Sequence, residues 1–509
     1  MTGKQKNRKY ILYWGVVLCC CFFINTPLYS EDSLPVAVSP KQEIRAVWLT
    51  TIYGLDWPHK PAATEAEAEK QQNELIAILD RLREANFNMV FLQVRQRGDV
   101  IYNSKIEPIS RVISGKYGVE SSYDPLAFAV EECHKRGMEC HAWFVTFPVG
   151  TPARVRAQGS KSVVKRHPEL CKLHKEEWYL DPGVSGTGDY ILSLVQEVVD
   201  GYDIDGVHFD YIRYPEGAET FPDKKEYEAS GKNMKLADWR RENINKIVAR
   251  VYDWVKEVKP WVQVSSSPLG KYSRIEKVPN AGWTAFETVF QDPISWIGEG
   301  KQDMIVPMMY YKNNNFFPFV EHWAENTKDR LFVPGLGVYR MEAKDSNWAV
   351  DDIIEQLDYV RNFGSSGCAF FRCSNVFDNT KGLYDRLKDT YFKYPAQLPP
   401  LTWLSDSIPS APQEIVVERL DDKLKLTWQE PDSLSESLTY TIYYTQSDSI
   451  DLGSSQAMIA TGVRDTVAFI PIDPETEKLY TFCVTASNRY RLESVPSRET
   501  FYYLSEFVK

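Results

Sequence analysis

Short apolar runs alternate with amphipathic segments over residues 44–392 of the chain. Each run is rich in β-branched and aromatic residues, which is typical of a buried strand. The runs are IRAVWLTT (44–51), NMVFLQVR (88–95), ECHAWFVT (139–146), DGVHFDYI (205–212), VQVSSSPL (262–269), MIVPMMYY (304–311), LFVPGLGV (331–338) and GCAFFRC (367–373). Between them, apolar residues recur at helical spacing, as in 67–85, 124–137 and 243–258. Asp124-Pro125 is typical of a helix start and Gly137 of a helix end.

Strands that alternate with helices predict parallel βαβ units. Eight such units favour the closed α/β barrel of the TIM type, whose active site lies at the carboxyl ends of the strands. A doubly wound open sheet is the alternative, but no glycine-rich phosphate loop follows the first strand. We therefore expect a (β/α)8 barrel over residues 41–395.

The pattern changes after a Pro- and Ser-rich linker, QLPPLTWLSDSIPSAP, that begins at about residue 396. Beyond it the helical period is lost, and short alternating strands separated by turns predict a small β-sandwich over 408–505. Trp428 in the second of these strands and Tyr480 near the last resemble positions of fibronectin type III modules. We expect an accessory domain without chemistry of its own.

Residues 1–30 have the pattern of a secretory signal peptide. Four basic residues precede the apolar run ILYWGVVLCCCFFI (11–24), which is short for a membrane span. Ser30 offers a cleavage point before Glu31. Lipid attachment at one of Cys19, Cys20 or Cys21 and an uncleaved anchor are alternatives. We expect export to the periplasm or cell surface, with membrane contact only through such a lipid anchor.

Charge and composition limit the partners and cofactors. The formal net charge moves from −11 to −15 when the four basic residues of 1–30 are removed, because no acidic residue lies there. Such a chain is a poor match for nucleic acid, whereas its 14 Trp and 29 Tyr suit either a core or stacking on sugar rings.

Neither a C-x-x-C nor an H-x-H pair occurs, so we expect no metal site and no cofactor. We expect a monomer that binds glycan.

The fourth strand runs directly into charged and phenolic residues. Alternate residues of a strand share a face, so His208 and Asp210 point into the barrel with Gly206, and Asp210 lies at its mouth. A buried carboxylate needs a partner such as Arg213 whether its role is structural or catalytic. The position at the mouth favours a catalytic Asp210.

Other predicted strand ends and the loops after them add polar and aromatic residues. Convergence of such residues predicts one substrate pocket. Its expected members besides His208 and Arg213 are Tyr53, Asp56, Trp57, Gln93, Arg95, Asp99, His141, Tyr310 and Arg372. Among them, Tyr53 and Trp57 are candidates for a sugar platform at the rim.

Glycosidases use two carboxyl groups across the scissile bond. Asp210 is the candidate nucleophile or base. The fifth strand ends in Ser265, Ser266 and Ser267, so the second carboxylate must come from elsewhere. Asp292 is the candidate acid, although its place before Pro293 also suits a helix cap. Glu287, Asp56 and Asp99 are further candidates.

The motifs IRAVWLTTIYGLDWP, NMVFLQVRQRGDVIY, ECHAWFV, DIDGVHFDYIRYP and DMIVPMMYY, in this order, resemble the glycosyl-hydrolase-like family 10. The resemblance covers roughly residues 41–395. It implies an exported TIM-barrel glycosidase, often a lipoprotein, often followed by a fibronectin-like module and in some members linked to peptidoglycan glycan without stem peptides. Motif positions characteristic of the family fall on Arg95, Asp99, His141, His208, Asp210, Tyr310 and Asp292. The wider clan resembles α-amylase-like barrels, in which the Asp210 position is the nucleophile and an acid ends the fifth strand.

Two functions follow from these patterns. The first is a glycoside hydrolase of an extracytoplasmic polysaccharide, with peptidoglycan glycan ahead of dietary or capsular glycan. The alternative is a binding protein on a decayed hydrolase barrel, for which the missing fifth-strand acid is an argument. An Asp210→Asn variant separates them, since a hydrolase loses turnover while keeping its fold.

Overall fold

The structure is a computed structural model that describes residues 39–327, 329–431, 437–472 and 478–504. The proposed signal segment, 1–30, lies outside them. No helix within the described ranges has the length and apolar character needed to cross a membrane.

The first part of the chain forms a parallel sheet with the strand order β10-β9-β8-β7-β3-β2-β1-β12-β11. Its strands are β1 (Ile44–Leu49), β2 (Met89–Arg95), β3 (Glu139–Val145), β7 (Gly206–Asp210), β8 (Gln263–Ser267), β9 (Met304–Ile305), β10 (Leu331–Phe332), β11 (Gly335–Leu336) and β12 (Gly367–Phe370). Strands β10 and β11 lie at the two ends of this order but belong to one short segment, 331–336. Because β10 pairs with β9 and β11 pairs with β12, this segment joins the two edges of the sheet. The TIM-like fold is thus as predicted, whereas the count of eight strand–helix units stays a prediction.

Alternation of side chains along β7 follows the sequence pattern. His208 stacks inside the barrel on Phe91 with ring centres 4.2 Å apart, whereas Phe209 faces outward beside Phe144. Gly206 is required at the inward position before them, because a Cβ atom there would lie 2.2 Å from Nδ1 of His141. The inward face therefore carries Asp210 to the end of the strand.

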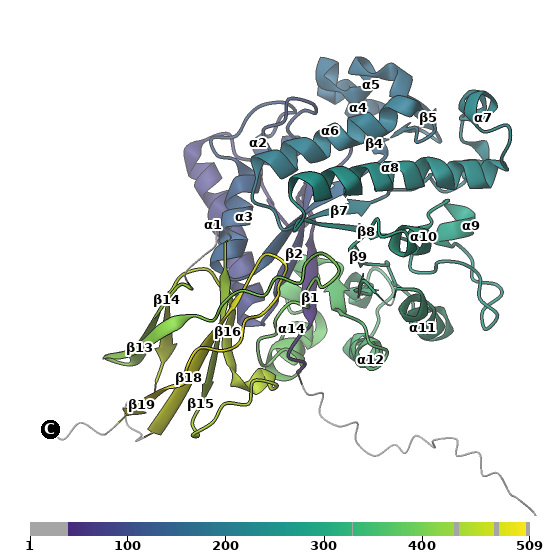
Figure 1. The fold of residues 1–509 in the computed structure, drawn as a ribbon. Helices are drawn as coiled ribbons and strands as arrows, with labels where there is room; N and C mark the ends of the chain where they lie inside the picture. Colours follow the sequence, from purple (N-terminus) through teal and green to yellow (C-terminus); the bar gives the residue numbers. More distant parts are fainter. Residues whose placement is uncertain (1–38, 328, 432–436, 473–477, 505–509) are drawn as a thin grey trace, which may run out of the picture. The chain divides into compact units, whose positions relative to one another are not determined.

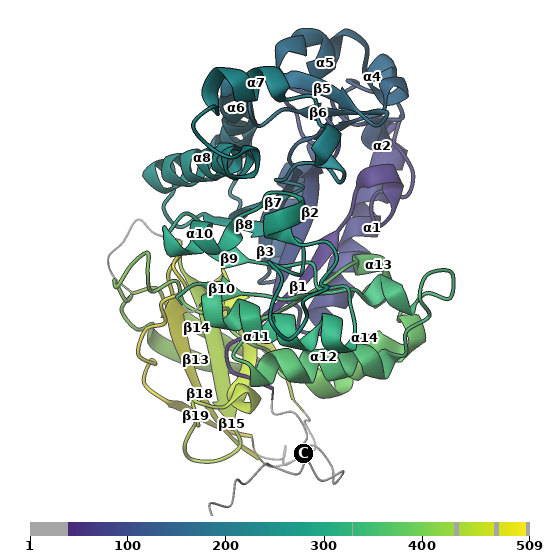
Figure 2. The same ribbon diagram turned by 90° about the vertical axis from the view of Figure 1, so that its right-hand side faces the viewer.

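Helices surround the sheet (Figures 1 and 2). They include α1 (Glu65–Glu84), α3 (Pro125–Lys135), α6 (Ser185–Gly201), α8 (Leu236–Val258), α10 (Pro293–Gly298), α11 (Phe317–Asn326) and α12 (Val350–Asn362). Asp124 caps α3 by accepting from the amides of Leu126 and Ala127, as its Asp-Pro sequence predicts. Thr64 and Glu67 form a capping box at the start of α1.

Between β3 and α6 the chain forms an insertion that the sequence pattern did not predict. Its small antiparallel sheet has the order β4-β6-β5, from β4 (Pro148–Gly150), β5 (Cys171–His174) and β6 (Glu177–Leu180). Helix α4 (Pro152–Gln158) follows β4 directly, and α7 (Lys224–Ser230) lies in the later loop after β7. Figure 2 shows the β5–β6 pair and α4 gathered at one end of the barrel strands.

The C-terminal region forms two antiparallel sheets, β13-β14-β17 and β16-β15-β18-β19. Their strands are β13 (Gln413–Leu420), β14 (Lys423–Gln429), β15 (Thr439–Thr445), β16 (Met458–Val463), β17 (Val467–Pro471), β18 (Lys478–Ser487) and β19 (Thr500–Leu504). Trp428 and Tyr480 lie in the core between them. The all-β domain is thus present, and its fibronectin type III assignment stays a prediction.

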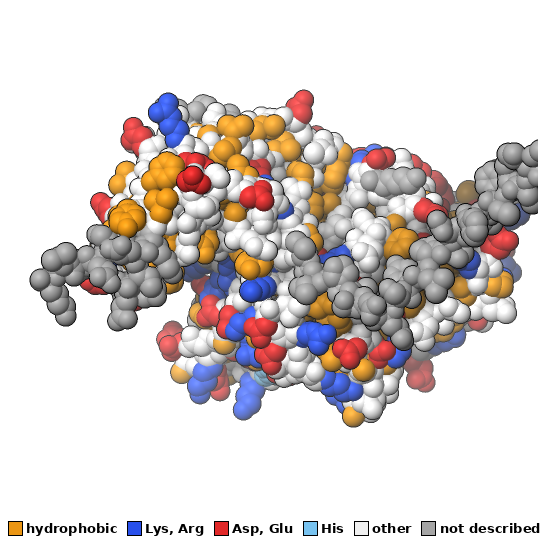
Figure 3. All heavy atoms as spheres, turned by 90° about the horizontal axis from the view of Figure 1, so that it is seen from below, with side chains coloured by type: hydrophobic (Ala, Val, Ile, Leu, Met, Phe, Trp, Pro, Cys, Tyr) orange, Lys and Arg blue, Asp and Glu red, His pale blue; other side chains and the backbone are white. Residues whose placement is uncertain are grey.

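Some apolar side chains of this domain face solvent, among them Val416, Leu420, Phe469 and Phe501. The view from below shows hydrophobic side chains at the surface between charged ones (Figure 3). Scattered exposure of this kind is normal for a folded protein.

Candidate active site

A cavity of about 450 Å³ lies at the carboxyl ends of the barrel strands. This volume is in the usual range for a ligand site. Strands β1, β2, β3, β7 and β8 and the segments after β9, β11 and β12 contribute to its wall. The lining residues are Trp48, Thr50, Ile52, Tyr53, Leu55, Gln93, Arg97, Trp143, Val145, Asp210, Tyr211, Arg213, Ser267, Leu269, Met308, Tyr310, Tyr311, Tyr339, Arg340 and Phe371.

Asp210 ends β7 in the wall of this cavity, with only 6% of its surface exposed. Burial raises the pKa of Asp210 to about 6, against the opposing effects of Arg213 and of the Tyr211 amide, which donates to Oδ1 at 2.7 Å. Tyr211 has a φ of 50°, a conformation that non-glycine residues rarely adopt. Strained residues of this kind often occur at functional sites. A carboxyl group with such a pKa can carry a proton to a reaction near neutral pH.

The backbone of Asp210 is held by Thr146, the residue that follows β3. Its amide and its Oγ1 both donate to the Asp210 carbonyl, each at 2.8 Å. The Thr146 carbonyl in turn accepts from Nη1 of Arg95 at 2.8 Å. Strand β2 therefore fixes the end of β3, and the end of β3 fixes the end of β7.

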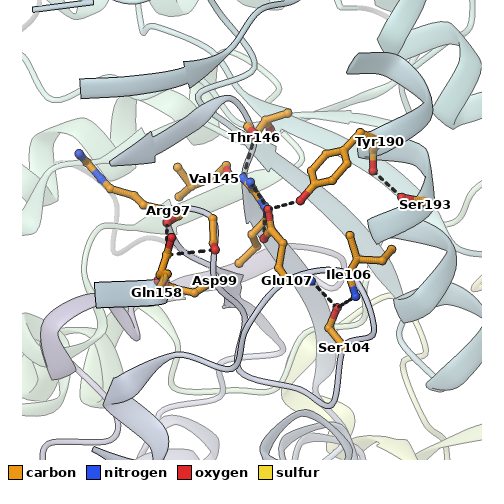
Figure 4. Close-up of polar contacts among 12 residues, drawn as sticks. Arg97, Asp99, Ser104, Ile106, Glu107, Val145, Thr146, Gln158, Tyr190 and Ser193 are labelled. Atoms are coloured by element: carbon orange, nitrogen blue, oxygen red, sulfur yellow. Dashed lines mark hydrogen bonds and ion pairs between the residues drawn. The ribbon is translucent and has the colours of Figure 1, made fainter. Parts of the chain in front are cut away.

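Arg95 is fully buried and is neutralised by Glu107 on the loop after β2. Two hydrogen bonds of 2.8 and 2.7 Å join the guanidinium to the carboxylate, which also accepts from the Tyr190 hydroxyl of α6 at 2.9 Å. Figure 4 shows Glu107 and Tyr190 directed toward each other next to Thr146. Arg95 thus acts on the strand ends rather than on a ligand in the cavity.

The two barrel histidines lie deeper in the interior. His208 accepts from the Trp48 indole at Nε2, 3.1 Å away, so its proton is on Nδ1, which contacts Ser265 Oγ at 2.9 Å. Burial lowers the pKa of His208, and nearby His141 lowers it further. His141 contacts Glu139 through Nε2 at 2.9 Å. Both rings form a layer beneath the cavity and do not line it.

Five residues of the expected pocket line the cavity, namely Tyr53, Gln93, Asp210, Arg213 and Tyr310. Tyr53 is 65% exposed, which suits the rim position expected of it. Gln93 is oriented by the amides of Thr51 and Ile52, which donate to its Oε1, so its NH₂ group is left for other contacts.

The other expected members lie outside the cavity wall, and local partners explain why. Trp57 is fully buried and donates to the Gln71 carbonyl, so it offers no sugar platform where it stands. Asp56 accepts from Thr50, and Asp99 accepts from Arg154 at 2.6 and 3.0 Å. Arg372 lies 3.8 Å from the Asp56 carboxylate.

Asp292 also lies outside the wall. Its Oδ1 accepts from the Ser295 amide at 3.4 Å, which caps α10, and from the Tyr272 hydroxyl at 2.7 Å. This is the cap geometry that its position before Pro293 suggested. The structure therefore does not bring Asp292 together with Asp210 in one cavity.

Sequence reasoning missed several lining residues, especially Arg97, Tyr311, Tyr339 and Arg340. Tyr339 and Arg340 follow the seventh strand, from which no site residue was expected. The signal was available, because GVYR places an aromatic and a basic residue just beyond the predicted strand end. Tyr310, Tyr339 and Phe371 form an aromatic wall, with the Tyr310 and Phe371 rings stacked at 5.5 Å.

Among the described residues, Asp210 is the only carboxylate that lines the cavity. Two glutamates lie behind lining arginines. Glu216 pairs with Arg213 at 3.0 Å, and Glu177 pairs with Arg97. Within the described residues, no three or more His, Cys, Asp or Glu side chains gather in a way that suits a metal ion.

A buried carboxyl group at the mouth of a TIM-like barrel, next to an aromatic wall, is typical of the glycoside hydrolase class. The chain belongs to the glycosyl hydrolase-like 10 family, whose model matches residues 43–332. This finding confirms the expected family.

Two curated relatives cover most of the chain. Glycosyl hydrolase YngK of Bacillus subtilis (strain 168) is 29% identical over an alignment of 485 residues, which covers 90% of this chain and 93% of that protein. Glycosyl hydrolase DigH of Escherichia coli (strain K12) is 31% identical over an alignment of 384 residues, which covers 68% of this chain and 87% of that protein. The solved glycoside hydrolase domain of PgaB (BpsB) from Bordetella bronchiseptica is 14% identical, covering 69% of this chain and 99% of that domain with a TM-score of 0.47.

Proposed function

We propose that the protein is an exported enzyme that hydrolyses O-glycosidic bonds of an extracytoplasmic polysaccharide, with peptidoglycan glycan as the first candidate. The observation that carries the proposal is Asp210, a buried carboxyl group in the wall of a cavity that has one aromatic side. Family membership supports hydrolysis. The basic and apolar pattern of residues 1–30 supports export, by signal cleavage or with a lipid anchor.

In this proposal Asp210 is the general acid that donates a proton to the oxygen of the scissile bond. Its pKa of about 6 leaves a useful protonated fraction near neutral pH, as a general acid requires. Arg213 and Arg97 lie in the same wall and have donors for sugar hydroxyls. Tyr53 at the rim and the wall of Tyr310 and Phe371 offer apolar faces to sugar rings.

The test is product release from a panel of polysaccharides, including peptidoglycan with and without stem peptides. Wild type is compared with Asp210→Asn and with Asp451→Asn, a matched change at an exposed aspartate of the sandwich. Wild type and Asp451→Asn should release fragments, and Asp210→Asn should lose about 10²- to 10⁴-fold in kcat. Thermal unfolding checks that all three proteins are folded.

The binding protein is the second candidate, because the cavity has a single lining carboxylate among the described residues. It predicts that none of the three proteins cuts any glycan while all retain glycan on an affinity column. That result would replace the hydrolase proposal.

A further inference from the structure

The cavity wall supplies one of the two catalytic groups that hydrolysis of a glycosidic bond uses. Two groups act across the scissile bond, one on the leaving oxygen and one on the anomeric carbon. Asp210 is the only carboxylate of the described residues in the wall. At the end of the fifth strand, the Ser267 hydroxyl is directed to the Phe209 carbonyl, 3.5 Å away. Glu216 and Glu177 are held by Arg213 and Arg97.

We infer that the second group comes from the substrate, and that the site cleaves 2-acetamido-2-deoxy-β-glycosides with the acetamido oxygen as the nucleophile. The inference rests on the proposed hydrolase function and narrows its substrate class. Some glycosidases need only one catalytic proton carrier because the substrate supplies its own nucleophile. Asp210 points into the barrel and is the only carboxylate that the described residues place in the wall, which fits a site with one catalytic proton carrier.

The reaction has two balanced steps. In the first, the acetamido carbonyl oxygen bonds to the anomeric carbon, the bond to the leaving sugar breaks, and the leaving oxygen takes the proton of Asp210. An oxazolinium ion and the Asp210 carboxylate result. In the second, Asp210 takes a proton from water, whose oxygen bonds to the anomeric carbon. The bond between that carbon and the acetamido oxygen breaks, and its electron pair restores the amide. Asp210 is again protonated, and the configuration is retained.

The cavity wall has the chemistry that an acetamido group needs. Its methyl group suits the apolar wall of Tyr310, Tyr339 and Phe371. The Trp143 indole N–H is buried in the same lining and interacts with the Asp210 carboxyl group, whose pKa this contact lowers. This donor is therefore placed to stabilise the Asp210 carboxylate that remains after proton transfer in the first step. Gln93 adds an NH₂ group whose orientation is fixed through its other atom.

The two charges that form in the first step are opposite and lie in the same cavity. The oxazolinium ion carries a positive charge, and Asp210 becomes negative as it gives up its proton. In a buried site such an opposite pair attracts strongly. A second carboxylate is therefore not required to stabilise the intermediate.

The first experiment compares matched substrates with the full chain. Peptidoglycan glycan strands without stem peptides are offered as such and after chemical removal of the N-acetyl groups. The acetylated strands should be cleaved at least about 100-fold faster, a factor typical of one catalytic group, and nuclear magnetic resonance should show the retained β anomer first. Replacing acetyl by fluoroacetyl groups should lower kcat with each added fluorine, since the carbonyl oxygen becomes a weaker nucleophile.

The second experiment uses variants. Asp210→Asn should lose about 10²- to 10⁴-fold in kcat/KM on glycan strands. On a dinitrophenyl glycoside of an N-acetylated disaccharide, whose leaving group needs no proton, kcat/KM reports only the first step and should fall by less than about tenfold, whereas kcat should fall further because Asp210 is also the base of the second step. Glu216→Gln and Glu177→Gln should each keep kcat within about tenfold, because neither glutamate acts on the reacting bond. A thiazoline analogue of the intermediate, titrated calorimetrically, should bind wild type.

The outcomes separate the two proposals. If no glycan is cut, the hydrolase function fails. If glycan is cut but de-N-acetylated strands react equally fast, or the product is inverted, or either glutamate variant loses more than about 100-fold in kcat, the enzyme stands and substrate participation is overturned.

Discussion

Arg491 of the C-terminal sandwich forms a buried ion pair with Glu139, the first residue of barrel strand β3. Its Nε donates to Oε1 of the carboxylate at 2.7 Å, and Nη2 pairs with Oε2. Gln263 of β8 donates to the same carboxylate at 3.1 Å, and His141 contacts it. Burial alone would raise the pKa of Glu139, but Arg491 and His141 hold it below its usual range. The sandwich is therefore bound to the floor of the barrel, in contrast to a loosely attached spacer.

Arg491→Met should destabilise the protein by about 3 kcal/mol, because the buried Glu139 charge loses its main partner. Urea unfolding at pH 7 measures the change. Arg464→Met is the matched control, since Arg464 makes a more exposed pair with Asp203, and should cost less than about 1 kcal/mol. A Glu139→Gln/Arg491→Met double variant should recover part of the loss.

The pH dependence of that effect has a definite sign. The pKa of Glu139 is lowered in the folded state, so its contribution is present above the unfolded value of about 4.3 and is lost as the pH falls below it. Wild type and Arg491→Met should therefore approach each other in stability toward acid pH. Equal stability of the two proteins at pH 7 would show that the ion pair contributes nothing.

Asp210 should destabilise the folded protein at neutral pH, since burial raises its pKa from 3.8 to about 6. The stability associated with this group is present below about pH 4 and is lost as the pH rises through 6. Two pKa units correspond to about 3 kcal/mol, so Asp210→Asn should be more stable than wild type by up to that amount at pH 8 and nearly equal to it at pH 4. Urea unfolding at the two pH values measures this. A variant less stable at pH 8 would indicate that Asp210 is held as a stabilised carboxylate.

The Asp292→Ala variant tests whether Asp292 is a helix cap or the catalytic acid. Loss of the cap on α10 should cost about 1 kcal/mol of stability. Because Asp292 does not line the cavity, kcat on the cleaved glycan should stay within about twofold of wild type at a temperature where both are folded. A drop of more than about 100-fold with an intact melting transition would instead make Asp292 the acid that the sequence suggested.

The sequence predicted the barrel and the position of Asp210 because both depend on a local period. Alternate residues of β7 face inward whatever lies around them, so His208 and Asp210 could be assigned a direction. The short strands β10 and β11 escaped a separate prediction, since Pro334 divides one apolar run into two pairing partners.

The sequence period did not predict how deeply the polar side chains at the strand ends are buried or which ion-pair partners they have. Arg95 and Asp99 were expected to contact substrate, but Glu107 and Arg154 neutralise them inside the fold. Arg154 belongs to the insertion after β3, whose structure has no strong sequence period. Whether a polar residue at a strand end reaches the cavity thus depends on partners from segments that the pattern did not describe.

Thr146 is expected to be a positioning residue for Asp210. Its Oγ1 donates to the Asp210 carbonyl, and it does not line the cavity. Thr146→Val keeps the shape and the amide donor but removes the hydroxyl, so the end of β7 is held by one hydrogen bond fewer. Since small displacements of a catalytic group are costly, kcat should fall about tenfold with KM nearly unchanged, and stability should fall by about 1 kcal/mol.

Thr146→Ser is the matched control for this prediction, because it restores the hydroxyl and loses only a methyl group. Its kcat should return to within about threefold of wild type, whereas the packing defect left by the missing methyl group should lower stability again. Steady-state kinetics on the glycan cleaved by wild type, together with urea unfolding, separates the two effects. If the Val and Ser variants lose kcat equally, or if only KM changes, Thr146 supports the strand without positioning the carboxyl group. Recovery of kcat in the less well packed Ser variant would show that the hydrogen bond to the Asp210 carbonyl, and not the volume of the side chain, sets the geometry of the acid.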